Sequence, residues 1–399
     1  MQTWRNLVPT SFRPLQILCE PNALLRPRGL RDDAGRRLPS GMFRPDGSTI
    51  DPALPTPGPA AVFRAPHPPT DGVRRGTWVY GGILLNHFGH VMIETGARLW
   101  AVQELLARSV PLDGIIFQRK KAAEVSGDGK LPFTSAAFLS VFSPDVPVAV
   151  ADRAETIETL YVPETGISVT PERFVGTREH WSFFRDRAGR VEPLPDQQDI
   201  YVSRTQDGAR GGFLFEADIE AVMAAAGYRI FHPQHHSISD QIATYRSARR
   251  LVSIDGSALH LAASALAPNA RVAILARREF FAWAIADQLR SAAGCQVSVI
   301  DARKAAYNFA GPMASLDQLA TVKGWSSSFV LPNFAELGGA LVQNGFLDRE
   351  PAWPTRGPAE LDRELQRASR LHKEALLPVP DAMLALQPYF NSQIAEGVR

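Results

Sequence analysis

Residues 251–275 read LVSIDGSALHLAASALAPNARVAIL, the pattern of an apolar strand, a turn, a short helix and a second apolar strand. Two strands joined through a helix are typical of a parallel sheet, because parallel neighbours need a crossover connection. The same alternation precedes this stretch, with a strand expected at 199–204, a helix at 216–226, a strand at 228–231 and a helix at 237–249. We therefore expect a parallel sheet with helices on its faces.

The first half of the chain predicts a further α/β region. Short apolar runs alternate there with segments whose apolar residues recur at helical spacing. We expect strands at 77–85, 114–117, 146–150 and 159–163, and helices at 90–106 and 134–142.

Proline content sets the expected domain boundaries. Pro52–Pro69 contains seven prolines, which suit neither a helix nor a central strand, and Glu192–Gln198 has the composition of a linker. We expect an irregular N-terminal segment at 1–75 with room for one short strand, α/β domains at 76–194 and 195–330, and a helical segment with a tail at 331–399.

Composition excludes several classes of protein. The chain has 399 residues, of which 45% are hydrophobic, so it can bury a core. Its 43 basic and 41 acidic side chains leave a formal charge of +2, which argues against a nucleic-acid binder. Two cysteines are too few for a disulfide framework or a four-cysteine zinc site. We see no secretory signal and no apolar run of about 20 residues, and expect a cytoplasmic protein that a membrane surface could still recruit.

The first group of chemically useful residues lies in NHFGHVMIETGARLW, residues 86–100. On one helix, His90, Glu94 and Arg98 are spaced i, i+4 and i+8 and lie on roughly one face. A carboxylate beside an imidazole can form a general base, whereas a surface ladder of ion pairs has the same spacing. His87, His90 and Glu94 could alternatively converge on a metal ion, although no fourth ligand is evident.

The second group lies in YVSRTQDGARGGF, residues 201–213, where a predicted strand leads into a glycine-rich loop. Arg204 ends the strand and Arg210 lies in the loop. Ligands of open parallel sheets bind beyond the carboxyl ends of the strands, so two guanidinium groups here could grip a diphosphate. The glycines fit neither G-x-G-x-x-G nor a Walker loop, and an ordinary surface loop is the alternative interpretation.

The third group is the Asp-Gly-Ser turn within SIDGSALHLAAS, residues 253–264. A helix that starts directly after a strand presents free backbone N–H groups, which attract anions. Gly256 would let the chain approach a ligand closely, Ser257 could cap the helix, and His260 lies one turn further on. An ordinary strand–turn–helix connection would look similar.

Taken in order, the three groups resemble glycosyltransferase family 61, which includes bacterial members linked to capsule and polysaccharide biosynthesis. The motifs that carry the resemblance are NHFGHVMIETGARLW, YVSR with a nearby arginine, FEADIEAVMAAAGYRIFHP, SDQIATYRSARR and DGSALH. Together they cover about residues 76–275.

The resemblance implies two Rossmann-like domains facing a cleft, which is the GT-B fold, with inverting chemistry, no cofactor and no obligatory metal. It implies an acceptor-side domain at 76–194 and a nucleotide-sugar-binding domain at 195–330. His90 and Glu94 would be catalytic, and Asn86 and Arg98 would orient them. The nucleotide-sugar would be bound by the remaining candidates, Ser203, Arg204, Arg210, Gly256, Ser257 and His260. The acceptor would be a glycan or a lipid-linked glycan.

Two other functions remain open at this stage. One is a metal-dependent hydrolase that uses His87, His90 and Glu94. The other is a protein that binds a nucleotide or glycan without turnover.

Overall fold

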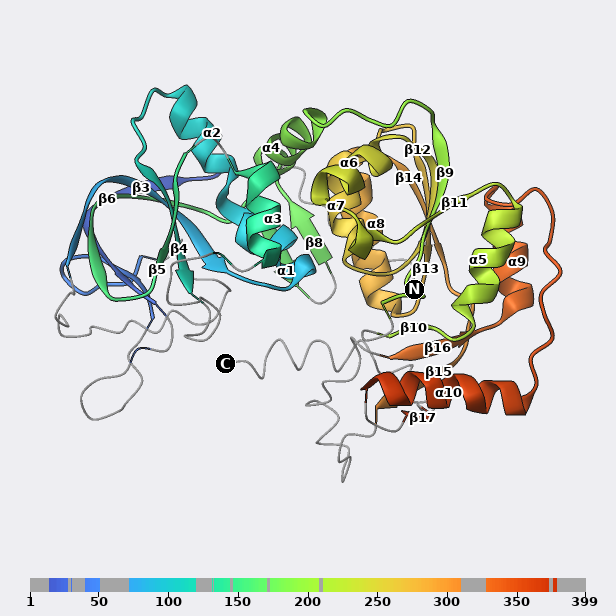
Figure 1. Ribbon diagram of the computed structural model, residues 1–399. Coiled ribbons are helices and arrows are strands. Elements are labelled where there is room, and N and C mark those ends of the chain that lie inside the picture. The colour runs from blue at the N-terminus through green and yellow to red at the C-terminus, as the bar shows by residue number, and fades with distance from the viewer. Residues whose placement is uncertain are drawn as a thin grey trace, which may run out of the picture. The chain divides into compact units, whose positions relative to one another are not determined.

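The computed structural model describes residues 14–27, 30, 40–50, 72–119, 131, 133–143, 146–170, 173–207, 211–309, 328–372 and 376–378 (Figure 1). The chain divides into two compact units. The first comprises residues 1–168 and 176–187, and the second comprises 169–175 and 188–399. The main division therefore follows Arg187, a few residues before the linker that the sequence predicts.

The first unit is built on a six-stranded mixed sheet with the order β2-β1-β6-β3-β4-β5. Strand β3 is parallel to both β6 and β4, and β4 is parallel to β5, whereas β1 is antiparallel to its neighbours β2 and β6. The strand bounds are β1 Ile17–Arg26, β2 Gly41–Phe43, β3 Val73–Leu84, β4 Gly114–Arg119, β5 Val148–Ala151 and β6 Glu155–Pro163.

Strand β1 is longer than the one short strand that the sequence pattern allows in the N-terminal segment. It is ten residues long and pairs with β6 from Ile17 to Leu25, so this part of the expected irregular segment belongs to the sheet. Pro21 and Asn22 interrupt its apolar pattern, and Asn22 has a φ of 52°. The buried Leu25 and Ala23 nevertheless join the core with Ile157, because tertiary pairing outweighs local propensity.

The helical region after β3 differs from the single helix expected at 90–106. It consists of α1 (Phe88–Ile93), the 3₁₀ helix η2 (Thr95–Arg98) and α2 (Trp100–Ala107). The Thr95 hydroxyl donates to the Ile83 carbonyl at 3.0 Å and accepts from the Leu85 N–H at 3.1 Å. These bonds tie the segment to the end of β3, and the helix is broken at this point.

The second unit contains the parallel sheet that the sequence predicts. Its order is β11-β9-β12-β13-β14, and every pairing is parallel. Renumbered along the chain, the order is 2-1-3-4-5, which is a doubly wound arrangement. The bounds are β9 Gln198–Val202, β11 Arg229–Phe231, β12 Ala248–Ile254, β13 Arg271–Leu275 and β14 Gln296–Ile300.

Helices cover both faces of this sheet (Figure 1). One face carries α5 and α9, whose Ile219, Met223 and Leu337 pack on Tyr201 and Val252. The other face carries α6, α7 and α8. Helix α6 begins with a capping box, because Ser237 and Asp240 each bond to the other's backbone N–H. The bounds are α5 Glu216–Ala225, α6 Ile238–Arg246, α7 Ala258–Ala265, α8 Glu279–Ala293 and α9 Phe334–Gln343.

A small four-stranded sheet and helix α10 complete the second unit. The order is β10-β16-β15-β17, and α10 packs on this sheet by burying Ala368 against Leu214 and Phe329. The part of 331–399 that the structure describes therefore belongs to the second unit. The bounds are β10 Gly212–Phe213, β15 Arg303–Phe309, β16 Phe329–Pro332, β17 Leu376–Pro378 and α10 Pro358–His372.

The remaining elements are α3 (Phe133–Phe142), α4 (Arg178–Gly189) and the pair β7 (Ile167–Thr170) and β8 (Arg173–Gly176). Among the described residues, none of the helices has the length and apolar character needed to cross a membrane.

Candidate active site

The parallel sheet of the second unit has its topological switch point between β9 and β12. Successive connections leave the sheet in opposite directions there, and ligands of doubly wound folds bind beyond the carboxyl ends of these two strands. Ser203 and Arg204 follow β9, and Asp255, Gly256 and Ser257 follow β12. The structure therefore brings Ser203 and Arg204 of the second group to the same sheet edge as the third group of residues that the sequence singles out.

Arg204 lies directly over the Gly256 turn. A Cβ atom at Gly256 would come within 2.8 Å of the Arg204 Nη1 atom, so the absence of a side chain makes room for the guanidinium group. The Arg204 Nε and Nη2 atoms donate to the Gly211 carbonyl at 3.4 and 3.3 Å, and Nη2 lies 3.3 Å from the Asp207 carboxylate. The side chain is 14% exposed, so the charge is held in place yet reachable.

Glu216, which sequence reasoning did not select, fixes the backbone of Arg204. Its Oε1 atom accepts a hydrogen bond from the Arg204 N–H at 2.7 Å and from the Tyr201 hydroxyl at 3.2 Å. Burial is the main cause that raises the pKa of this carboxyl to about 7. An acidic residue at the first helical position after a glycine-rich loop was the available indication in the sequence.

Asp255 was also missed, although it belongs to the predicted turn. Its fully buried carboxylate accepts from the backbone N–H groups of Arg277 and Arg278 at 2.7 and 3.1 Å, and from Arg278 Nε at 2.8 Å. The two arginines keep the pKa of Asp255 low although burial opposes this. Both arginines follow β13. Burial is the main cause that lowers the pKa of each, and the charge of Arg204 lowers both further. Three arginines thus gather at the carboxyl edge of the sheet.

The other predicted residues of this unit differ in burial and in position. Ser203 is buried and its hydroxyl lies 3.1 Å from that of Thr205. Ser257 stands at the N-cap of α7, and among the described residues its hydroxyl caps no backbone N–H. Arg210 lies outside the described residues.

His260 is enclosed in the core of the second unit. It is 2% exposed, its Nδ1 atom lies 2.7 Å from Gln288 Oε1, and its ring meets the edges of Phe174 and Phe281 at centroid distances of 5.0 and 6.0 Å. This environment gives His260 a packing role, and its contact with a ligand stays a prediction.

In the first unit, the structure joins His90 to Glu94. The His90 Nδ1 atom pairs with the Glu94 carboxylate, and the side chains are 52% and 42% exposed. The rings of His87 and His90 meet edge to face at 5.0 Å, and the Asn86 side-chain oxygen accepts from the Thr134 N–H at 3.3 Å. An imidazole and a carboxylate are therefore paired at the surface, just beyond the carboxyl end of β3.

Arg98 does not share this surface, so the prediction of one face for His90, Glu94 and Arg98 is wrong. Arg98 is 3% exposed, donates from Nε to the Pro163 carbonyl at 3.0 Å and lies over the Tyr80 ring at 5.3 Å. Burial lowers its pKa. The 3₁₀ turn that carries Arg98 rotates about 120° per residue instead of 100°, which changes the face on which it emerges.

The described residues contain no group of three histidine, cysteine, aspartate or glutamate side chains that could hold a metal ion. His87, His90 and Glu94 are all described, so the geometry does not support the hydrolase alternative at this position.

A family model described as Glycosyltransferase 61 matches residues 88–273, a stretch that includes His90, Glu94, Arg204 and Gly256. This stretch belongs to the glycosyltransferase 61 family. The predicted family is therefore confirmed. Membership indicates a glycosyltransferase role, with a sugar donor and a glycan acceptor in general terms. No curated protein matches the chain.

The family match also shows which residues lie outside the shared segment. It ends at Ala273, before the arginines that follow β13 and before helix α10. Asn86 precedes it.

We predict that Glu216→Gln flattens the pH dependence of stability. The pKa of Glu216 in the folded chain, about 7, lies above its ordinary 4.5, so folding favours the protonated form. The associated stability is fully present below pH 4.5 and is lost as the pH rises through 7. Between pH 5 and 8, the melting temperature of the wild type should therefore fall relative to that of the variant. Melting curves that shift in parallel over this range would contradict the assignment.

Proposed function

We propose that the chain is an inverting, metal-independent glycosyltransferase that moves a sugar from a nucleotide-sugar to a glycan acceptor in polysaccharide biosynthesis. The observation that carries the proposal is the position of Arg204 over Gly256 at the switch point of a parallel sheet, within the segment that matches the family. The doubly wound second unit supports a GT-B arrangement, which forms part of the proposal.

The donor side of the proposal rests on charge. When the bond from the sugar to the nucleoside diphosphate breaks, the leaving group gains negative charge that must be stabilised in the transition state. Arg204 and Arg278 supply guanidinium groups near the sheet edge, and the N-terminus of α7 adds the positive end of a helix dipole. Asp255 holds the Arg278 guanidinium at 2.8 Å, so this group is positioned before a ligand arrives. Arg210 is proposed to join them.

The acceptor side of the proposal assigns proton transfer to the His90–Glu94 pair. In an inverting transfer the acceptor oxygen attacks the anomeric carbon while the bond to the diphosphate breaks, and the hydroxyl proton passes to a base. A carboxylate paired with an imidazole can accept this proton as a general base. Asn86 and Arg98 would hold the segment that carries the pair, Asn86 through α3 and Arg98 through the end of β6.

The acceptor itself is proposed to be a glycan or a lipid-linked glycan. A lipid-linked acceptor would bring the protein to the inner face of the membrane, while the nucleotide-sugar supports a location in the cytoplasm. The non-catalytic alternative predicts that the protein binds a nucleoside diphosphate but never releases sugar from the donor.

We expect Arg204→Ala and Arg210→Ala each to weaken nucleoside-diphosphate binding about tenfold to a hundredfold, because a charge-assisted contact is lost. Titration calorimetry measures the affinity, and circular dichroism checks that the fold is kept. Arg370→Ala, which removes an exposed arginine of α10, serves as the control. If Arg204→Ala and Arg370→Ala bound the diphosphate equally well, Arg204 would not belong to the site.

We expect Glu94→Gln to lower kcat by about 10²–10⁴ with little change in donor affinity, because the substitution keeps the shape and removes the charge of the pair. Glu104→Gln is the matched control, since Glu104 forms an exposed i, i+4 pair with Arg108 on the neighbouring helix. If Glu94→Gln turned over normally and His90→Ala were inactive, the result would identify His90 as the base. Near wild-type rates for both would remove the pair from the mechanism.

We expect EDTA to leave transferase activity unchanged, because arginines and the helix dipole of α7 stabilise the charge of the leaving group in this proposal. Initial rates with and without chelator provide the measurement. Loss of activity that a single divalent ion restores would overturn the metal-independent mechanism.

A further inference from the structure

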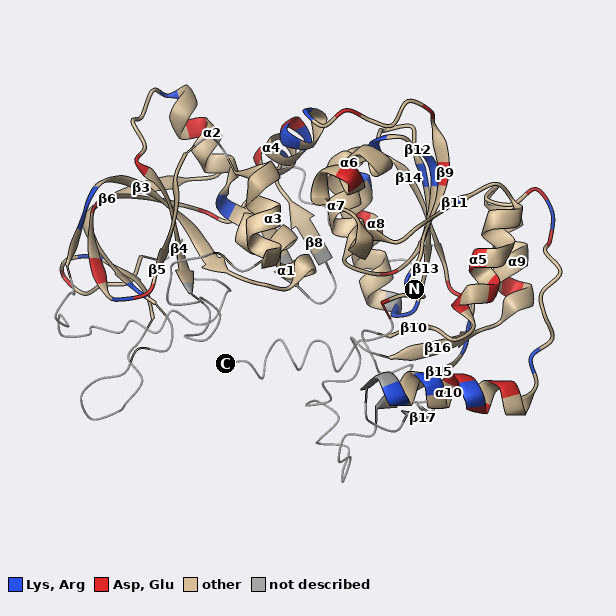
Figure 2. Cartoon of the chain, in the orientation of Figure 1, with Lys and Arg blue, Asp and Glu red and all other residues tan. Residues whose placement is uncertain are grey.

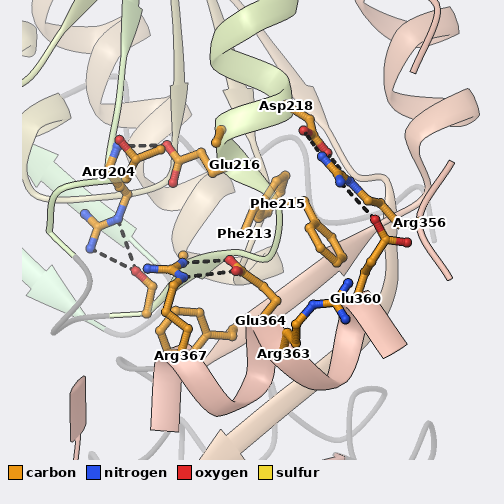
Figure 3. Close-up of a pocket in the computed structure, with 15 residues that line it drawn as sticks. Arg204, Phe213, Phe215, Glu216, Asp218, Arg356, Glu360, Arg363, Glu364 and Arg367 are labelled. Carbon is orange, nitrogen blue, oxygen red and sulfur yellow. Dashed lines mark hydrogen bonds and ion pairs between the residues drawn. The ribbon is translucent and has the colours of Figure 1, made fainter. Parts of the chain in front are cut away.

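A pocket of about 540 Å³ opens beside Arg204, and helix α10 forms one of its walls (Figure 3). Strand β10 and the first turn of α5 form the opposite side. The volume lies within the range of small-ligand sites. Because α10 follows the segment that matches the family, this wall is supplied by a part of the chain that the family model does not cover.

Most of the charges that line the pocket are already paired. Arg356 donates to the Asp218 carboxylate at 2.9 and 2.5 Å and to Glu360 at 3.1 Å. Arg367 donates to Glu364 at 3.0 and 2.6 Å. Figure 2 shows the same mixture of basic and acidic residues along α10. A balanced lining of this kind suits a neutral ligand with many polar atoms better than it suits a bare anion.

Arg363 is the exception among the charged groups of this wall. Within the part of the chain that the structure describes, it makes no hydrogen bond or salt bridge, and it is exposed on the α10 wall one turn before Arg367. A guanidinium group presents a planar set of donors, which can bond to the acceptor atoms at the edge of a flat ring or stack on its face.

Phe215 adds an aromatic surface to the same pocket (Figure 3). It precedes α5 with a left-handed φ of 58°, a conformation that is costly for a bulky residue. One part of the ring packs against the cluster of Leu214 and Phe329, and Arg356 lies 5.3 Å from its centroid. The pocket thus combines an aromatic ring, paired polar groups and one available planar donor.

Resting on the proposed function, we infer that this pocket binds the nucleoside of the donor and that Arg363 determines which base is accepted. Arg204 lines both the pocket and the switch point, so one ligand can place its diphosphate at Arg204 and its nucleoside against α10. Phe215 offers the base or ribose an apolar surface, and Arg363 donates to an acceptor atom of the base. The specificity of the enzyme for its nucleotide would then arise outside the family segment.

The test compares ADP, GDP, CDP and UDP as ligands of the wild type, Arg363→Gln, Arg204→Ala and the matched control Arg370→Gln. The wild type should prefer one diphosphate by about tenfold or more. Arg363→Gln should lower affinity for that diphosphate about threefold to thirtyfold and reduce the preference, because hydrogen bonds to the base are lost. Arg204→Ala should weaken all four alike and keep their order, and Arg370→Gln should change nothing.

Several results would overturn the inference. Arg363→Gln could weaken all four diphosphates equally, which would make the pocket a phosphate site. An unchanged Arg363→Gln, or a wild type without preference, would exclude a role in base selection. A wild type that bound no diphosphate would instead overturn the proposed function. If Arg363→Gln changed the order of the four affinities while Arg204→Ala left all four unchanged, the inference would stand and Arg204 would not belong to the phosphate site.

Discussion

The buried Asp255 carboxylate is the interaction on which the candidate site depends. It is fully enclosed after β12 and accepts the backbone N–H groups of Arg277 and Arg278 after β13. Burying a charge is expensive unless it is paired, and removing one partner of a buried pair leaves the other uncompensated. Asp255 therefore joins the ends of two neighbouring strands and allows adjacent arginines to remain at the sheet edge, where repulsion would otherwise separate them.

A second carboxyl group, that of Glu216, holds Arg204 in place through its backbone. Glu216 accepts the Arg204 N–H and lies at the start of α5, so this bond joins the residue that follows the end of β9 to the start of α5. Because Glu216 is buried beside Arg204, its protonation near pH 7 changes the charge close to the proposed diphosphate position. Acidic groups thus position the basic groups that would bind a ligand, and the acidic groups do not need to contact the ligand themselves.

In the first unit, a break in the helix places residues with equal sequence spacing in different environments. His90 and Glu94 emerge at the surface, whereas Arg98 turns into the sheet and donates to Pro163. Helical periodicity could predict the His90–Glu94 pair, because both lie within one continuous turn. It could not predict the position of Arg98, because the helix is broken between Glu94 and Arg98, where Thr95 bonds to the end of β3.

By itself, the sequence determined the parallel α/β pattern of the second unit, the positions of Arg204 and Gly256 at strand ends, and the family, because strand and helix periodicities and short motifs are local. Only the tertiary structure decided that β1 joins the sheet and that His260 is buried. It also decided that Asp255 pairs with the arginines after β13 and that Glu216 and α10 lie beside Arg204. These features depend on contacts between residues far apart in the chain. Burial and charge compensation there are properties of the assembled fold, which no local pattern encodes.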